Sequence, residues 1–190
     1  MSETPAFAFL ASRRSHSARV LTLPVPDRAQ VADILTAALR VPDHGKLEPW
    51  RLIVLERPAL ARLADLASRR ATEQAMDPEQ TAKGRGQFDG SSLAVAVIAS
   101  PKDSAKIPVV EQTLSAGALC VGIVNAAHAA GWGACWLTGW PAHDRGFVER
   151  GLGLAAQEWV AGIVHLGTIG TVPPDRPRPD LGRAVTWVSE

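Results

Sequence analysis

The chain has 190 residues, which is enough for one domain with a substantial core. Its formal net charge of +1 gives no electrostatic reason to expect a nucleic-acid or membrane partner. The first residues lack the basic start and long apolar run of a signal peptide, so we expect a cytoplasmic protein. Two cysteines without CxxC spacing and five scattered histidines indicate reduced core thiols and no metal site.

The N-terminal region predicts a short helix over residues 4–14, followed by Ser15 and a polar stretch. Arg13 and Arg14 lie at the end of this helix, next to the serine hydroxyl. Guanidinium and hydroxyl donors match the oxygens of a phosphate, so this motif can hold one. A solvated helix end explains the same residues, and the motif alone leaves both interpretations open.

A second helix is predicted to begin after Asp27, which can cap it with Gln30 as the reciprocal partner, and to end at Pro42. The loop that follows, VPDHGKLEPW, is rich in hydrogen-bond donors and precedes an apolar strand, RLIVLE. A polar loop between a helix and a strand is suited to a ligand site. A plain polar connection is an equally good interpretation of this loop.

The middle of the chain predicts a helix over residues 58–69 and then a polar stretch over residues 69–90. This stretch is too long for a plain connection, so we expect a partly helical excursion or a lid. The next segment, SSLAVAVIAS, is apolar without alternation, which predicts a strand buried on both faces.

The stretch from Pro108 to Gly131 predicts a long helix buried on most of its circumference. Pro108 suits a first helical position, and Gly131 suits a left-handed C-cap. Gly117 and Gly122 each cost roughly 1 kcal/mol of helix propensity relative to alanine. Close approach to another helix, which could belong to a second subunit, would explain them. A membrane span is the rival interpretation, and the polar residues over a marginal length disfavour it.

After this helix, GWGACWLTG predicts a strand that enters a glycine turn. It follows a helix instead of opening one, which argues against a dinucleotide-binding fingerprint. Residues 143–150 predict a short helix, and EWVAGIVHLGTIG predicts the last buried strand. The tail over residues 171–190 is rich in proline and arginine and regains strand character at AVTWV. This arm either crosses to a partner and adds to its sheet or packs on its own subunit.

Helices and strands alternate loosely over residues 1–190, which predicts a single domain of α+β or three-layer α/β/α class. Four motifs then resemble the FMN-dependent nitroreductase family, most closely its short single-domain NAD(P)H members. They are the RRS after the first helix, the PDHxxxxPW loop, EQxLSAGA leading to GWGxxW, and the late strand ending LGT. The resemblance implies a three-layer α/β/α fold with a mixed central sheet. It also implies an intertwined homodimer with FMN at the interface, and so favours the crossing arm.

By this resemblance, one group of residues would hold the FMN phosphate. Arg13 and Ser15 match the phosphate contacts, and Arg14 lies beside them near the ribityl chain or ring edge. Arg176 and Arg178 are candidates for the basic pair that often contacts the phosphate from the C-terminal region.

A second group would contact the flavin ring. Arg40 and His44 match positions that reach the flavin from the partner subunit. Asp43 and Lys46 depart from the family pattern, in which many members have a serine and an asparagine, and Lys46 is a candidate for the cation near the pyrimidine oxygens. Gly139 matches the turn whose backbone lies near the flavin N5. The segment lining the ring is Trp136, Leu137 and Thr138.

The resemblance implies an oxidoreductase that moves hydride from NADH or NADPH through flavin N5 to a nitroaromatic, quinone or similar small-molecule acceptor. We expect a two-step, ping-pong exchange and no catalytic side chain, because the flavin itself carries the chemistry. Enone reduction or reductive dehalogenation on the same fold is one alternative. A flavin-binding dimer with little turnover is another.

Overall fold

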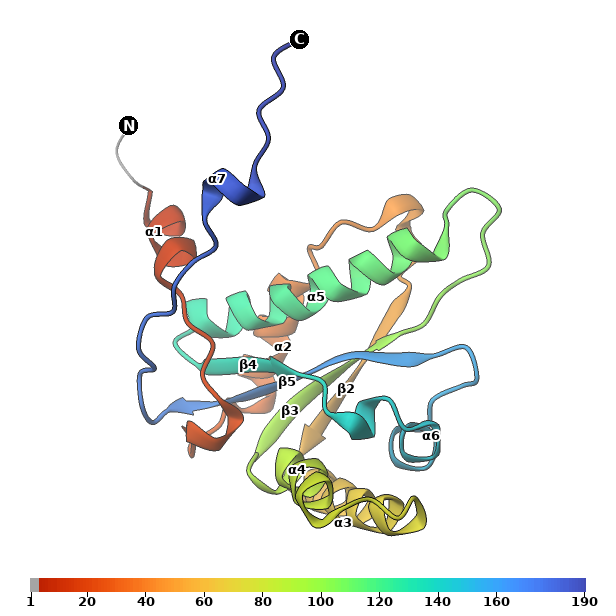
Figure 1. The fold of residues 1–190 in the computed structure, drawn as a ribbon. Helices are drawn as coiled ribbons and strands as arrows, with labels where there is room; N and C mark the ends of the chain where they lie inside the picture. Colours follow the sequence, from red (N-terminus) through yellow and green to blue (C-terminus); the bar gives the residue numbers. More distant parts are fainter. Residues whose placement is uncertain (1–3) are drawn as a thin grey trace.

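The computed structural model describes residues 4–190 and has three layers (Figure 1). A central β-sheet separates two hydrophobic cores, and helices cover both of its faces. One face carries α2 (Arg28–Ala38) and α5 (Val109–Ala129). The other carries α3 (Arg57–Glu73), α4 (Pro78–Asp89) and α6 (Arg145–Leu152). The expected α+β, three-layer α/β/α class is confirmed.

The sheet is organised around its longest strand, β5 (Trp159–Ile169). It pairs with β3 (Leu93–Ala99) on one edge and β4 (Gly133–Leu137) on the other. The short β1 (Leu21–Thr22) pairs with its end, and β2 (Trp50–Glu56) lies beyond β3. Every pairing among the described strands is antiparallel, so the mixed sheet that the resemblance implies has no parallel pairing within residues 4–190.

Local sequence signals account for several elements. Asp27 accepts a hydrogen bond from the Gln30 backbone N–H at 2.9 Å, and the Gln30 side chain accepts one from the Asp27 N–H at 3.0 Å. This capping box begins α2 as predicted. All residues of β3 are buried, because helices pack on both faces of the sheet where it lies.

The central helix α5 ends as predicted but is less buried than expected. Gly131 has φ +85°, and the N–H of the next residue, Trp132, donates to the Ala127 carbonyl oxygen at 2.9 Å, which closes the helix end. Pro108 is the N-cap, one position before the helix. The inner side of α5 packs on the sheet and α2, whereas apolar residues on its outer side remain exposed, including Val110 and Leu114. By length and composition this described helix could also span a membrane.

The two glycines of α5 have different surroundings. A Cβ atom at Gly122 would lie 2.9 Å from the Ala38 carbonyl oxygen, so this glycine permits close packing of α5 on α2 of the same chain. A Cβ atom at Gly117 would meet no atom within 4 Å. The predicted close approach to another helix is therefore found at Gly122, and Gly117 lies on the open side.

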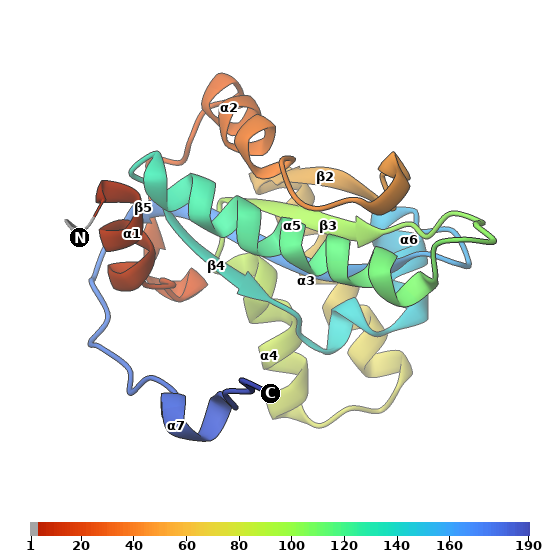
Figure 2. The same cartoon turned by 90° about the horizontal axis from the view of Figure 1, so that it is seen from above.

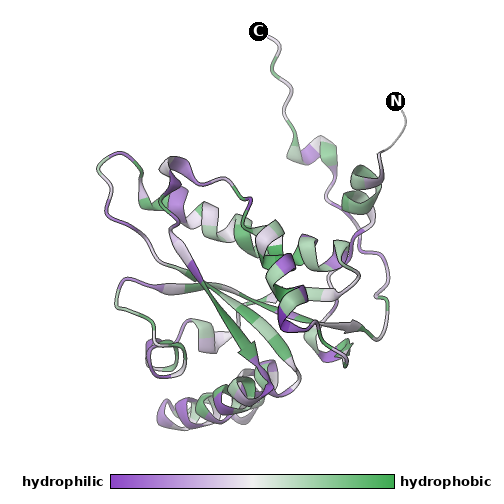
Figure 3. Ribbon diagram, turned by 180° about the vertical axis from the view of Figure 1, so that it is seen from behind, coloured by the Kyte–Doolittle hydropathy of each residue, from purple (hydrophilic) through white to green (hydrophobic). Residues whose placement is uncertain are grey.

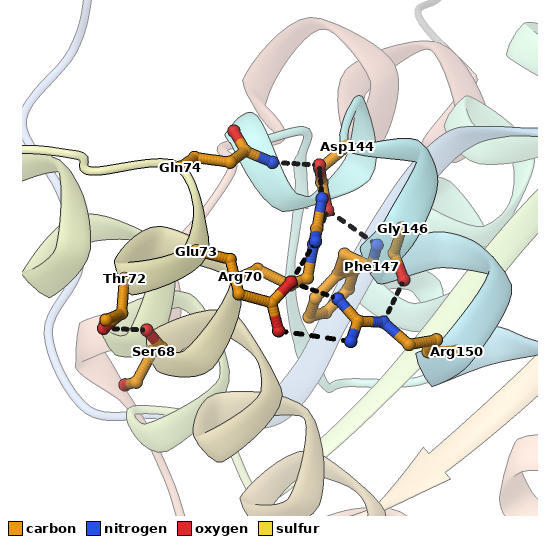
Figure 4. A network of polar contacts seen from close by, with 9 residues as sticks. All are labelled: Ser68, Arg70, Thr72, Glu73, Gln74, Asp144, Gly146, Phe147 and Arg150. Carbon is orange, nitrogen blue, oxygen red and sulfur yellow. Dashed lines mark hydrogen bonds and ion pairs between the residues drawn. The ribbon is translucent and has the colours of Figure 1, made fainter.

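Residues 69–90 form the end of α3, a connecting loop and α4, which packs beside α3. A polar network ties the end of α3 to α6 (Figure 4). In this network the Arg70 guanidinium donates to both carboxylate oxygens of Asp144 at 2.6 and 2.8 Å, and Arg150 pairs with Glu73 at 2.7 Å. The polar residues at the start of this stretch thus stabilise the packing of helices, and a lid role for it stays a prediction.

The two ends of the described chain project from the body of the molecule. Helix α1 (Pro5–Ser12) has no buried residue, although Figure 3 shows it as largely hydrophobic. The tail carries a short α7 (Leu181–Ala184) and then runs away from the sheet (Figures 1 and 2). The strand predicted at AVTWV does not form within the chain, and Trp187 is 88% exposed. A strand needs a neighbour to pair with, and this segment has none among the described residues.

Candidate functional site

A hollow of about 520 Å³ opens between three segments that are far apart in sequence. They are the residues after α1, the end of β4 and the beginning of the C-terminal tail, which runs beside α1 (Figure 1). The lining comprises Arg13, Arg14, Ser15, Ser17, Cys135, Trp136, Leu137, Pro173, Pro174, Arg176 and Arg178. The structure thus unites the predicted phosphate group, both tail arginines and part of the predicted ring-lining segment.

The charge of this hollow is strongly positive. Four arginines contribute to the lining, and no carboxylate does. Arg14 donates to the Pro174 carbonyl oxygen at 3.0 Å and forms an ion pair with Asp175, which lies beside the hollow. The hydroxyls of Ser15 and Ser17 add neutral donors. Guanidinium forks and hydroxyls in this arrangement suit an anion with several oxygens, such as a phosphate.

Two histidines hold the arginine-bearing segment in place, and the sequence analysis did not identify them. His16 is 4% exposed, and its backbone N–H donates to the Ala134 carbonyl oxygen at the start of β4 at 3.0 Å. Its Nδ1 lies 3.0 Å from Nε2 of His128 near the end of α5. The only sequence signal was the position of His16 directly after the RRS motif and of His128 in an otherwise apolar helix.

The opposite wall of the hollow is apolar and includes Trp136. A Cβ atom at Gly162 of β5 would lie 2.0 Å from Trp136 Nε1, so only glycine lets the indole lie flat against the neighbouring strand. Cys135 is buried, and burial raises the pKa of its thiol to about 11. The thiol is therefore protonated near neutral pH and is a poor nucleophile.

Thr138 and Gly139 lie just beyond the end of β4 and do not line the hollow. Gly139 has an extended backbone with φ −92°, so no left-handed conformation requires glycine there. Instead, a Cβ atom at Gly139 would lie 2.3 Å from the Gln87 side-chain oxygen of α4. The Gln87 side chain of α4 therefore packs against this turn.

Of the remaining predicted residues, His44 and Lys46 lie near the other end of α5, whereas Arg40 lies between Ala38 and Val41, which pack near Gly122 in the middle of α5. Arg40, His44 and Lys46 are exposed, and His44 Nδ1 is 2.7 Å from the carboxylate of Glu111 in the first turn of α5. His128, beside the hollow, is in the last turn of the same helix. At 1.5 Å per residue, the 17 positions between Glu111 and His128 span about 25 Å. One chain therefore does not bring the two predicted groups together.

These features define a class of protein, namely a three-layer α+β chain with an arginine-lined hollow beside the end of a central strand. The profile of the Nitroreductase family matches residues 10–168. The "Putative NAD(P)H nitroreductase" of Haemophilus influenzae is 33% identical over 164 residues, which cover 86% of this chain and 88% of that protein. The "Putative NAD(P)H nitroreductase YdjA" of Escherichia coli K12 is 31% identical over 163 residues, which cover 86% and 87%. The chain belongs to the Nitroreductase family and is an oxidoreductase.

Solved structures agree with this assignment at the level of the fold. The nitroreductase-like family protein from Bacillus cereus superposes with a TM-score of 0.81 at 21% identity, covering 99% of this chain and 98% of that one. A nitroreductase of Desulfovibrio desulfuricans in complex with FMN superposes with a TM-score of 0.76 at 21% identity, covering 99% of both chains. The expected nitroreductase-like fold is thus confirmed.

Proposed function

We propose that this protein binds FMN and uses it to move hydride from NADH or NADPH to a nitroaromatic, a quinone or a similar small acceptor. The observation that carries the proposal is the arginine-lined hollow with Trp136 at its wall, in a chain of the Nitroreductase family. The Desulfovibrio protein of the same fold is described in complex with FMN. The names of the curated relatives give NAD(P)H as the electron donor.

The residues present fit an FMN molecule. Its phosphate would lie among the four arginines, where it would compete with Asp175 for the Arg14 guanidinium. Its flat ring would lie toward Trp136 and Leu137, which are partly exposed at the end of β4, and toward Thr138 beyond them. A phosphate at one end and an apolar wall at the other match a polar tail and an aromatic ring.

FMN supplies the capacity to accept a hydride and to release two electrons when it is bound. The chain would supply position and charge. The backbone at Gly139 would lie next to the reacting edge of the ring, and Lys46 and Arg40 would stabilise negative charge at its pyrimidine side. Both thiols are buried, and burial raises the pKa of Cys120 to about 12 and of Cys135 to about 11, so neither would act as a base or a nucleophile near neutral pH.

A homodimer would complete this site. The outer face of α5 exposes Val110, Leu114 and Val121 and leaves the space over Gly117 open. In a two-fold dimer formed through this face, with the two α5 helices antiparallel, the first turn of one α5 would lie near the last turn of the other. His44 of the partner subunit would then lie close to the arginine-lined hollow, which resolves the separation of about 25 Å within one chain.

A groove between α2 and β2 would accommodate the C-terminal arm, residues 171–190, of the partner subunit. This groove of about 980 Å³ is mostly apolar and lies between α2 and the edge strand β2, with Val31, Leu35 and Val54 in its lining. The outer edge of β2 has no strand partner among residues 4–190. An unpaired edge beside an apolar groove favours strand addition, and the AVTWV segment of a second copy has the required pattern.

The first test is the absorbance spectrum of the purified protein before and after anaerobic NADH or NADPH. The proposal expects bound flavin that bleaches with at least one nucleotide. Arg13→Ala should weaken FMN binding about tenfold or more, because it removes a charge-assisted contact. Arg19→Ala is the matched control, because Arg19 is exposed, lies in the same segment and does not line the hollow. A colourless protein that cannot be reconstituted with FMN would contradict the proposal.

Two further measurements test the mechanism and the assembly. Initial rates over a matrix of donor and acceptor concentrations should give parallel double-reciprocal lines, as ping-pong exchange requires, and intersecting lines would reject it. Removing residues 179–190 keeps all the arginines of the hollow but deletes the AVTWV segment. Sedimentation should then show a weaker dimer than that of the full chain. An unchanged dimer would show that the arm does not cross.

A further inference from the structure

A backbone carbonyl group determines which ring nitrogens of His16 and His128 carry hydrogen. His128 Nδ1 lies 2.7 Å from the Val124 carbonyl oxygen, which can only accept, so Nδ1 carries the hydrogen. In the neutral ring Nε2 then accepts, and it lies 3.0 Å from His16 Nδ1, which must donate. His16 therefore donates a hydrogen bond to His128, and His128 donates one to the backbone of α5.

These hydrogen bonds hold in place the segment that carries Arg13 and Arg14 of the hollow. His16 follows Ser15 directly, and it is bonded through its backbone to β4 and through its ring to α5. The rings lie 5.2 Å apart between centroids, and His16 is almost completely buried. A residue held at two points in this way restricts the positions of the two residues before it, Arg14 and Ser15.

Protonation of both rings is incompatible with this arrangement. One added proton enters the free Nε2 of His16 and leaves the bond intact, whereas a second proton on His128 Nε2 makes two N–H groups face each other across 3.0 Å. Burial lowers the pKa of both rings, and the nearby Arg13 lowers that of His128 further. Both rings are consequently neutral near neutral pH and lose their bond only in acid.

The nearby carboxylate is Asp175 of the tail, and it is already paired with Arg14. Residues 121–131 of α5 and its end contain no Asp, Glu, Lys or Arg, and α1 contains no titratable side chain. The strand β4 contributes only the Cys135 thiol, and the part of β5 that pairs with it contributes only His165. The 3₁₀ turn at residues 18–20 adds Arg19, another positive charge.

We propose that the bond between His16 and His128 positions the arginine-bearing segment for an anionic ligand, so that affinity for FMN falls when acid protonates both rings. The two histidines are positioning residues that act through Arg14 and Ser15. This inference rests on the proposed function, because it takes FMN as the ligand of the hollow.

The test compares FMN dissociation constants from about pH 7.5 to about pH 4.5, a range that extends well below the ordinary histidine pKa because both ring pKa values are lowered. Holoprotein is diluted into each buffer, and released FMN is measured by its fluorescence. His16→Asn places an amide where Nδ1 was, and this amide can donate to neutral His128 or, after rotation, accept from the protonated ring. His16→Leu is of similar size but can do neither. Thermal melts verify that both variants fold.

Wild-type affinity should fall about threefold to tenfold more than that of His16→Asn over this range, as expected for the loss of one hydrogen bond. The second ionisation of the FMN phosphate also falls near pH 6, but it affects all variants equally and cancels in this comparison. His16→Leu should bind more weakly than wild type at about pH 7.5. Equal pH dependence in wild type and His16→Asn, or wild-type affinity in His16→Leu, would overturn the inference.

A readout without flavin separates this inference from the proposed function. Nitrogen-15 spectra of the histidine rings should show His128 protonated at Nδ1 and unprotonated at Nε2 near neutral pH. If the spectra show this tautomer but the wild type binds no FMN, the proposed function is wrong, and so is the effect of the histidine pair on FMN affinity. If FMN binds but His128 carries its proton on Nε2, the positioning inference alone fails.

Discussion

His165 should make folding stability fall in mild acid, and replacing it with leucine should remove that loss. The ring lies in the middle of β5 with 0% exposure, and neither nitrogen has a hydrogen-bond partner among the described residues. Burial lowers its pKa from 6.5 to about 4. The unfolded chain therefore takes up a proton below about pH 6.5 that the folded chain refuses until about pH 4. Stability is lost as the pH falls through this window.

The magnitude follows from the two pKa values. Single-site linkage gives a loss of about 2 kcal/mol of unfolding free energy between pH 7 and pH 5 for this one group. His165→Leu removes the titration and replaces a polar ring that has no protein partner by an apolar side chain. The variant should therefore be no less stable than wild type at pH 7, because nothing that was hydrogen-bonded is lost.

Urea unfolding at pH 7 and pH 5 measures the unfolding free energy of each protein at pH 7 and its loss between the two pH values. Wild type also loses stability through His16 and His128, whose pKa values burial lowers, and these contributions are common to the variant. The difference between the two proteins should isolate the loss of about 2 kcal/mol. His143→Leu, which removes an exposed histidine, should keep the wild-type pH dependence. If His165→Leu loses as much stability as wild type between the two pH values, the reasoning is wrong.

Three further predictions concern packing. Asp144→Ala should lower the unfolding free energy by about 3 kcal/mol or more, because it removes the N-cap of α6 and leaves the mostly buried Arg70 without its bidentate partner. The exposed Asp33→Ala should change it by less than about 0.5 kcal/mol in the same urea titration, and equal effects would reject the argument. Gly122→Ala should cost about 1–3 kcal/mol, because its Cβ would lie 2.9 Å from a backbone oxygen of α2. Gly117→Ala should instead gain about 1 kcal/mol within the chain and weaken the dimer in sedimentation, and an unaffected dimer would show that α5 does not pack closely there.

Much of the fold could be predicted because its signals are local. The capping box of Asp27 and Gln30 and the left-handed Gly131 depend on neighbours within a few positions, and both occur as expected. The failures share a physical cause. Apolar patterning predicted burial of all of α5 and a strand at AVTWV, but one face of α5 and the Trp187 side chain are exposed, because no element of the described chain packs on them.

The site was predictable only in part. The RRS motif and Trp136 were named from sequence, and the structure places them around one hollow. The bond between His16 and His128 joins positions 112 residues apart, and no periodicity or spacing reveals such a contact. Gly162 was missed for the same reason, since its need to be glycine comes from an indole on the neighbouring strand.

The length of α5 gives the proposed dimer a physical rationale. The helix holds the arginine-lined hollow at one end and the loop of His44 and Lys46 at the other, about 25 Å apart. In the proposed two-fold dimer each ligand would contact both chains, so ligand binding and subunit association would share contacts. Linkage then requires FMN to tighten the dimer by the same factor by which dimerisation tightens FMN binding. A change on the outer face of α5, such as at Gly117, would consequently weaken FMN binding without touching the hollow.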